Sequence, residues 1–226
     1  MRTAALLLAA GRGERLGATG GKGFLELAGR PLLAYAVETV EACDPIEAFV
    51  VAAPSGREDD AKAEASSSRK LHAVVAGGET RQGSVRRALE SVSDGFDAVV
   101  IHDVARPFAP AALFERSLAA LGSADGAVPA VPLANTLKRV AGHDVLETVP
   151  RVDLVTVQTP QAFLRRPLEE AHAAADREGF VATDDAALLE RAGFRVVTVP
   201  GDPENRKITV PEDLRWAEAL VRARRG

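Results

Sequence analysis

Short apolar runs alternate with longer amphipathic stretches along most of the chain. The apolar runs predict strands at 6–10, 47–53, 71–76, 97–101, 127–131 and 195–201. Helical spacing of apolar residues predicts helices at 31–43, between the turn at 54–56 and the serines at 66–68, at 80–92, 110–121 and 167–178, and from 211 onward. Strands that alternate with helices in this way are typical of an α/β protein, here with a mostly parallel, doubly wound sheet flanked by helices.

The alternation stops between 132 and 156. Two apolar-rich segments, NTLKRVA and DVLETV, meet there at Gly142-His143-Asp144, with no helical pattern between them. This arrangement predicts a β-hairpin. A hairpin of this length cannot bury both of its faces by itself. We therefore expect it to pack on the body of the protein or on another subunit.

Composition narrows the class of protein. With 226 residues, of which 46% are apolar, the chain is long enough for a single α/β domain, and its net charge of −4 does not indicate nucleic-acid binding. The single cysteine, Cys43, excludes internal disulfides and a cysteine-based metal cluster. The start of the chain imitates a short signal peptide, but its apolar run continues into a glycine-rich loop, so we interpret it as the first strand. No segment is long enough to cross a membrane, and we expect a cytosolic protein.

The loop after the first strand has the composition of a phosphate-binding site. It contains glycines at 11, 13, 17, 20, 21 and 23 and the cations Arg12, Arg15 and Lys22. Glycines let backbone N–H groups approach a ligand, the cations favour an anion, and a triphosphate suits a loop of this length. Neither common phosphate motif matches. A P-loop would need a glycine at Leu16 and a hydroxyl at Gly23, and in a dinucleotide fingerprint the third glycine would come one residue before Gly17.

Further candidate residues follow the later strands. Asp103 comes just after the strand at 97–101, where an acid beside a phosphate loop would be a natural Mg²⁺ ligand or substrate contact. The alternatives for Asp103 are a helix cap or an ion pair with Arg106. We interpret His102 as a packed or capping residue. Ser84 either belongs to the first turn of its helix or lines a nucleobase pocket.

Some polar residues indicate little when taken singly. Arg151 and Lys207 by themselves indicate only surface charge. The acidic pair Asp184-Asp185 fits the first turn of a helix, where the dipole favours acids, and Thr183 is the predicted N-cap.

The combination of motifs is more specific than any one of them. In order, the chain contains the glycine loop with Arg15 and Lys22, GGETRQGSV, HDVARP, NTLKR, Arg151, TPQAF, TDDAALLE and NRKITVPEDL. Across nearly its whole length it thereby resembles the 2-C-methyl-D-erythritol 4-phosphate cytidylyltransferase family of the non-mevalonate isoprenoid route. The resemblance implies a Rossmann-like nucleotidyltransferase domain whose β-arm, at about 132–156, clasps a second subunit in a homodimer. It also implies a Mg²⁺-dependent transfer of CMP from CTP to methylerythritol phosphate, with release of pyrophosphate.

The same resemblance implies roles for residues on the nucleotide side of the site. CTP would be held by the loop residues Ala9, Ala10, Gly11 and Gly13. Cytosine would be read by Gly78, Glu79 and Ser84. Arg15 and Lys22 would stabilise charge on the α-phosphate in the transition state.

The acceptor side is implied in the same way. Asp103, Ala105 and Arg106 would lie at the sugar-phosphate side, with Asp103 as the metal ligand. Thr136 and Arg151 would reach across from the arm of the partner subunit. Lys207 and Thr159 would complete the acceptor site.

This sequence departs from the family pattern at four places. Gly21-Lys22-Gly23 replaces Pro-Lys-Gln, Glu79 replaces the base-reading Asp, and Asn135 and Pro150 replace the Asp before the arm threonine and before the arm arginine. The lysine, threonine and arginine themselves are present, so we expect activity.

Three alternatives stay open at this point. A ribitol-5-phosphate cytidylyltransferase shares most of these motifs. A molybdopterin guanylyltransferase is a more distant alternative, and the hairpin argues against it. A catalytically silent nucleotide-binding protein is the alternative outside enzymes, and the presence of Arg15, Lys22, Arg151 and Lys207 argues against it.

Overall fold

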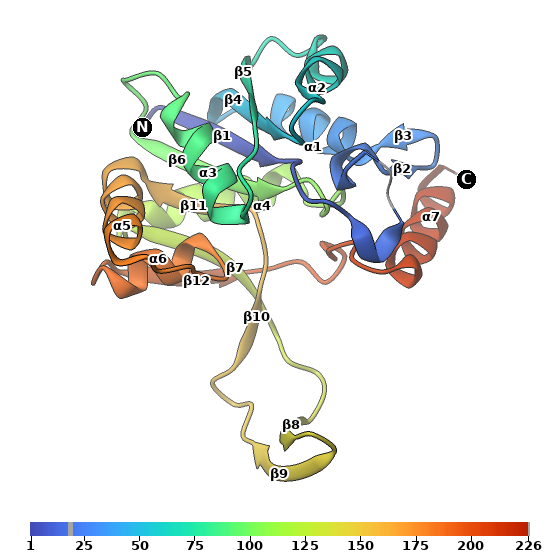
Figure 1. Ribbon diagram of the computed structural model, residues 1–226, viewed down its shortest axis with the longest axis vertical. Coiled ribbons are helices and arrows are strands. Elements are labelled where there is room, and N and C mark those ends of the chain that lie inside the picture. The colour runs from blue at the N-terminus through green and yellow to red at the C-terminus, as the bar shows by residue number, and fades with distance from the viewer. Residues whose placement is uncertain (18–19, 226) are drawn as a thin grey trace.

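The fold is built on one twisted sheet with helices on both faces (Figure 1). The computed structural model describes residues 1–17 and 20–225. Within these residues an eight-stranded sheet has the order β10-β7-β11-β6-β1-β4-β5, and β12 also pairs with β7. The strands are β1 (Thr3–Leu8), β4 (Ile46–Ala53), β5 (Leu71–Ala76), β6 (Ala98–Asp103), β7 (Gly126–Pro132), β10 (Val155–Val157), β11 (Gln161–Leu164) and β12 (Val196–Pro200). The predicted α/β class is confirmed.

The central strand β1 is covered on both faces. It pairs in parallel with β4 on one side and β6 on the other. Ala5 and Leu7 face a cluster with α1 (Leu32–Glu41), α2 (Glu58–Ala65) and α4 (Ala111–Ala119), which is followed by the short helix η3 (Ala120–Gly122). Ala4 and Leu6 face a cluster with α3 (Arg81–Glu90), α5 (Arg165–Glu178) and α6 (Asp185–Arg191). Because both faces are buried, the strand is a continuous apolar run, which is why the sequence showed it clearly.

The sheet is not wholly parallel. β11 lies between β6 and β7 and runs antiparallel to both, and β10 is antiparallel to β7. The apolar pattern predicts neither a helix nor a strand for 155–163. The hairpin follows the carboxyl end of β7, and the chain returns from it into the sheet at that same end. β11 therefore runs opposite to its neighbours β6 and β7.

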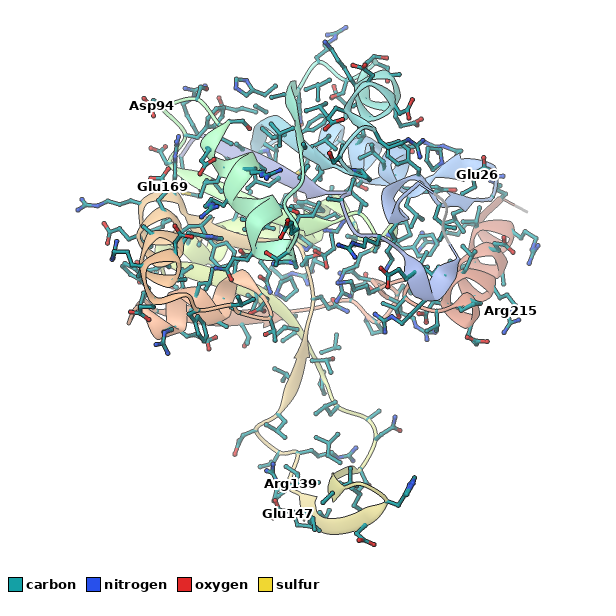
Figure 2. The ribbon with its side chains drawn as sticks, in the orientation of Figure 1. Glu26, Asp94, Arg139, Glu147, Glu169 and Arg215 are labelled. Atoms are coloured by element: carbon teal, nitrogen blue, oxygen red, sulfur yellow. The ribbon has the colours of Figure 1, made fainter. Side chains whose placement is uncertain are left out.

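A hairpin projects from the body as an arm (Figure 1). Its strands β8 (Leu137–Ala141) and β9 (Asp144–Val149) pair antiparallel around Gly142, which has a φ of 58°. The predicted hairpin is therefore confirmed. Arg139 and Glu147 lie opposite each other near its tip, with a 2.6 Å ion pair (Figure 2).

The C-terminal helix α7 (Pro211–Arg225) covers a separate apolar cluster with the small hairpin of β2 (Glu26–Leu27) and β3 (Arg30–Pro31).

One predicted cap was wrong: α6 is capped by Asp184, whose side chain accepts a hydrogen bond from the Ala187 N–H, and not by Thr183. In the part of the chain that the structure describes, no helix has the length and apolar character needed to cross a membrane.

Candidate active site

A cleft of about 790 Å³ opens at the carboxyl ends of β1, β5 and β6. Its walls come from residues 8–16, Lys22, 54–55, 77–81, Ser84, Arg87, 103–105, Lys207 and Thr209. β4 lies on one side of β1 and β6 on the other, so the strand order reverses at β1. Open α/β sheets bind ligands at the carboxyl ends of the strands where the order reverses.

The glycine loop forms one wall of the cleft, and a backbone hydrogen bond within the loop holds Lys22 in that wall. The Lys22 N–H donates to the Gly11 carbonyl at 2.7 Å, within the loop that also contains the short helices η1 (Glu14–Leu16) and η2 (Lys22–Phe24). Gly13 has a φ of 70°, which favours glycine. A Cβ at Gly23 would lie 2.7 Å from the Ala9 Cβ, so only glycine lets the segment after Lys22 pack this closely on the end of β1.

The first turn of α3 forms the opposite wall. Thr80 caps the helix by accepting from the Gly83 N–H at 2.9 Å. Ser84 is buried, and its hydroxyl accepts from the Gly78 N–H at 3.0 Å and donates to the Thr80 carbonyl. The Ser84 hydroxyl therefore fixes the glycine turn at the mouth of the cleft.

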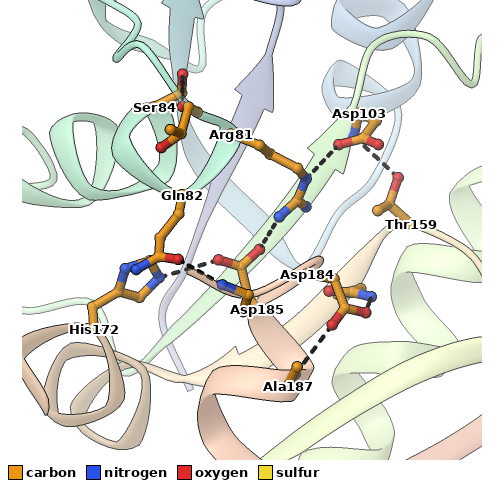
Figure 3. A network of polar contacts seen from close by, with 12 residues as sticks. Arg81, Gln82, Ser84, Asp103, Thr159, His172, Asp184, Asp185 and Ala187 are labelled. Carbon is orange, nitrogen blue, oxygen red and sulfur yellow. Dashed lines mark hydrogen bonds and ion pairs between the residues drawn. The ribbon is translucent and has the colours of Figure 1, made fainter. Parts of the chain in front are cut away.

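Charged groups meet at the floor of the cleft, and Figure 3 shows Arg81 between Asp103 and Asp185. The Asp103 carboxylate accepts from Arg81 Nε at 3.2 Å and from Lys207 Nζ at 2.5 Å. Burial alone would raise the pKa of Asp103, but the Arg81 and Lys207 cations outweigh burial and hold it well below its usual range. Burial lowers the pKa of Lys22 to about 8, and the nearby Lys207 ammonium adds to this effect. The ion pair with Arg106, one of the alternatives for Asp103, is not the one observed: Asp103 pairs with Arg81 and Lys207.

His102 is buried beneath this floor. Burial lowers its pKa to about 4, so it is neutral near pH 7. Its ring lies against Phe114, and its Nδ1 is 3.2 Å from the Thr159 hydroxyl. The interpretation of His102 as a packed residue agrees with this geometry.

Most of the candidate site residues come together in the cleft. Its lining includes Ala9, Ala10, Gly11, Gly13, Arg15, Lys22, Gly78, Glu79, Ser84, Asp103, Ala105 and Lys207.

Four candidates lie outside the lining. Arg106 donates to the Asn205 carbonyl at 2.7 Å, and Thr159 accepts from the Asp103 N–H at 3.0 Å, so both support the cleft from behind. Thr136 and Arg151 belong to the arm, where Arg151 Nη1 donates to the Leu133 carbonyl at 3.0 Å.

From the sequence, Arg81 indicates only the start of a helix, and Asp185 only an acid that the helix dipole favours. The structure places Asp185 in a buried ion pair with Arg81 at 2.6 Å and within 3.1 Å of His172 Nε2. The signal available in the sequence was the pair Asp184-Asp185, because one N-terminal cap needs only one of the two acids.

Metal ligands are sparse in this cleft. Among the described residues, no three His, Cys, Asp or Glu side chains are grouped so that they could hold a metal ion. Asp103 is the buried carboxylate of the lining, whereas Glu14 and Glu79 are exposed. An ion here would need ligands from a substrate.

Fold and site together define the class of the protein as an α/β nucleotidyltransferase. The chain matches the family model of 2-C-methyl-D-erythritol 4-phosphate cytidylyltransferase over residues 3–223, and it belongs to that family. The family predicted from the sequence is thus confirmed.

Relatives from several bacteria support this membership. The 2-C-methyl-D-erythritol 4-phosphate cytidylyltransferase of Deinococcus radiodurans is 47% identical over 220 residues, which cover 97% of this chain and 90% of the relative. That of Geotalea uraniireducens is 41% identical, with 99% and 98% covered. The crystal structure of the enzyme from Thermus thermophilus has a TM-score of 0.81 and 37% identity, and covers 98% of this chain and 100% of that chain.

Proposed function

We propose that this cleft is where the chain performs its family's reaction, the transfer of CMP from CTP to 2-C-methyl-D-erythritol 4-phosphate with release of pyrophosphate. The observation that carries the proposal is the convergence of Lys22, Lys207 and Arg81 on one cleft beside the glycine loop. Two anions must meet in this reaction, and a set of fixed cations offsets their repulsion.

The chemistry needs electrostatic stabilisation more than a base. The acceptor is a phosphate monoester that is ionised at neutral pH, so it attacks the α-phosphorus of CTP without losing a proton to the protein. Positioning and charge neutralisation then carry most of the catalysis, as in other phosphoryl-type transfers. Neutral, buried His102 is consistent with a site that uses no histidine base.

The nucleotide side follows from the two walls of the cleft. We assign the backbone of Ala9 to Gly13 to CTP and the turn at Gly78 and Glu79, held by Ser84, to the cytosine. Arg15 and Lys22 then lie on the same wall as the triphosphate and stabilise charge that develops on the α-phosphate.

A divalent cation, which we propose to be Mg²⁺, fits the donor set. Mg²⁺ in phosphate-transfer sites is commonly held by one or two carboxylates and by the phosphates themselves. Asp103, ionised and at the floor of the cleft, is the carboxylate that would hold it, through the oxygen lone pairs that Arg81 and Lys207 do not use. When bound, the ion would neutralise phosphate charge.

The arm supplies the argument for a homodimer. Val140, Val145, Leu146 and Val152 are each more than half exposed, and such an apolar surface is stabilised by burial against a second copy. In a symmetric dimer the arm of one subunit can reach the cleft of the other. Thr136 and Arg151 would thereby join Lys207 at the acceptor phosphate. We expect the dimer to act in the cytosol.

The test is pyrophosphate release from CTP and Mg²⁺, with methylerythritol phosphate and ribitol 5-phosphate offered as separate acceptors. Release with methylerythritol phosphate alone is the expected result. Release with ribitol 5-phosphate alone would keep the cleft and its chemistry but change the acceptor. CTP binding without release with either acceptor would favour a silent nucleotide-binding protein.

A further inference from the structure

Behind the cleft, charges alternate in a chain that runs into the interior (Figure 3). Lys207 pairs with Asp103, Asp103 with Arg81, and Arg81 with Asp185, at 2.5, 3.2 and 2.6 Å. Asp185 also lies 3.1 Å from His172 Nε2. The chain links the segment before α7 to β6, α3, α6 and α5, and only its outer members line the cleft.

Asp185 is not needed to cap its own helix. The neighbouring Asp184 accepts from the Ala187 N–H at 3.1 Å and from Gln161 Nε2 at 2.8 Å. Asp185 instead uses one oxygen for Arg81 and the other for His172, and it is almost wholly buried. Burial alone would raise the pKa of Asp185, but Arg81 and the hydrogen bond from His172 outweigh it and lower the pKa.

Arg81 depends on the two aspartates for its position. Its Nε pairs with Asp103 and its Nη1 with Asp185, while Nη2 is buried without a hydrogen-bond partner among the residues described. The adjacent Gln82 anchors the same helical turn to the loop before α6 through the Phe180 carbonyl and the Ala182 N–H. Arg81 uses only one nitrogen, Nε, for Asp103, because its Nη1 is paired with Asp185. The second carboxylate oxygen of Asp103 is therefore available to Lys207.

We propose that Asp185 is a positioning residue for the transfer reaction: it holds Arg81 so that Asp103 is shared between Arg81 and Lys207, which fixes the Lys207 ammonium at the acceptor side. This inference rests on the proposed function of the cleft. Without the charge of Asp185, Arg81 can pair with both oxygens of Asp103 and displace Lys207. Removing one partner of a buried ion pair is costly because it leaves the other charge unpaired. Arg81 would therefore shift toward Asp103, and the change at Asp185 would reach the cleft although Asp185 does not line it.

The test compares Asp185→Asn with the wild type in steady-state kinetics. We expect kcat/KM for methylerythritol phosphate to fall about 10-fold to 100-fold, the usual cost of losing a residue that orients a ligand-binding group. KM for CTP should stay unchanged, because the nucleotide walls keep their contacts. Asp176→Asn is the matched control: it breaks the exposed 2.6 Å pair between Arg86 on α3 and Asp176 on α5, and should leave the kinetics unchanged.

A double-mutant cycle separates positioning from simple structural support. In a Lys207→Ala background, Asp185→Asn should have little further effect, because its influence passes through Lys207. The same fold-loss in both backgrounds would overturn the inference. If Asp185→Asn does not fold, Arg81→Lys takes its place, since one ammonium cannot bridge both aspartates. Wild-type kcat/KM for Arg81→Lys would also overturn it.

A second readout does not depend on turnover. Acetic anhydride labelling of Lys207, followed by mass spectrometry, should increase in Asp185→Asn because the amine loses its carboxylate partner. Unchanged labelling contradicts the inference. A wild-type protein that releases no pyrophosphate would contradict the proposed function, whereas an active wild type with an equally active Asp185→Asn variant would contradict this inference alone.

Discussion

The cleft and the arm differ in how far each is completed by its own chain. In the cleft, Asp103 is 7% exposed and pairs with cations from two distant segments. On the arm, Val152 is 87% exposed and Val145 is 61% exposed. The charged floor of the cleft is thus assembled within one chain, whereas the arm presents apolar surface that, in our proposal, a second copy would cover.

The largest expected effect tests the cleft, the part of the proposed site that one chain builds by itself. The change is Lys22→Ala. We expect kcat/KM to fall by about 100-fold or more, the scale of losing a preorganised charge at a phosphoryl transition state. Lys62→Ala, on the exposed side of α2, removes a lysine without touching the cleft and serves as the control. A wild-type rate for Lys22→Ala in the pyrophosphate assay would remove Lys22 from the mechanism.

The arm is tested by asking whether it acts in trans. Arg151→Ala should lower kcat/KM on the order of 10-fold to 100-fold, since it removes one charged contact to the acceptor. Mixing Arg151→Ala with Lys22→Ala subunits should recover about a quarter of the wild-type activity, because half of the dimers are mixed and each mixed dimer has one intact site.

Verified heterodimers decide the outcome of the mixing experiment. If they show no recovery, Arg151 acts within its own subunit or not at all, and the contrast between cleft and arm is lost. Size-exclusion chromatography of each variant checks that dimers form before the activities are compared.

A smaller effect comes from the titration of Lys22. Its pKa of about 8 means that the cation, present below that pH, is lost as the pH rises. We expect kcat/KM for CTP to decline above pH 8, by up to about tenfold per pH unit, since this parameter reports the free enzyme. In Lys22→Arg the decline should move to higher pH, because a guanidinium stays charged. A flat wild-type profile through this range would contradict the assignment.

The two regions also differ in what sequence could predict. The glycine loop and β1 were visible because their signals are local: a continuous apolar run and closely spaced glycines. The antiparallel insertion of β11 was not visible, because a short strand that returns from the arm has no pattern that fixes its direction.

Long-range pairing was also beyond the sequence. Lys207 and Asp103, like Arg81 and Asp185, are 104 residues apart, and nothing in the local pattern of either residue names its partner. Taken singly, such residues resemble surface charges or helix-end acids. Their roles became visible only when the fold brought α3, β6 and α6 together.

The smallest expected effect concerns the ion pair at the tip of the arm, which contrasts with the Lys207–Asp103 pair, whose carboxylate is buried. Arg139 Nε and Glu147 Oε1 are 2.6 Å apart, but the two side chains are 64% and 55% exposed, so solvent screens their attraction. Glu147→Gln should lower the free energy of unfolding by less than about 1 kcal/mol, which for a chain of this size is less than about 4 °C in Tm. Arg166 and Glu170 on α5 form a comparable exposed pair on the body, and Glu170→Gln is the matched control. A larger shift for Glu147→Gln alone, growing with protein concentration, would mean that the partner subunit buries the tip of the arm. The interface would then extend along the whole hairpin.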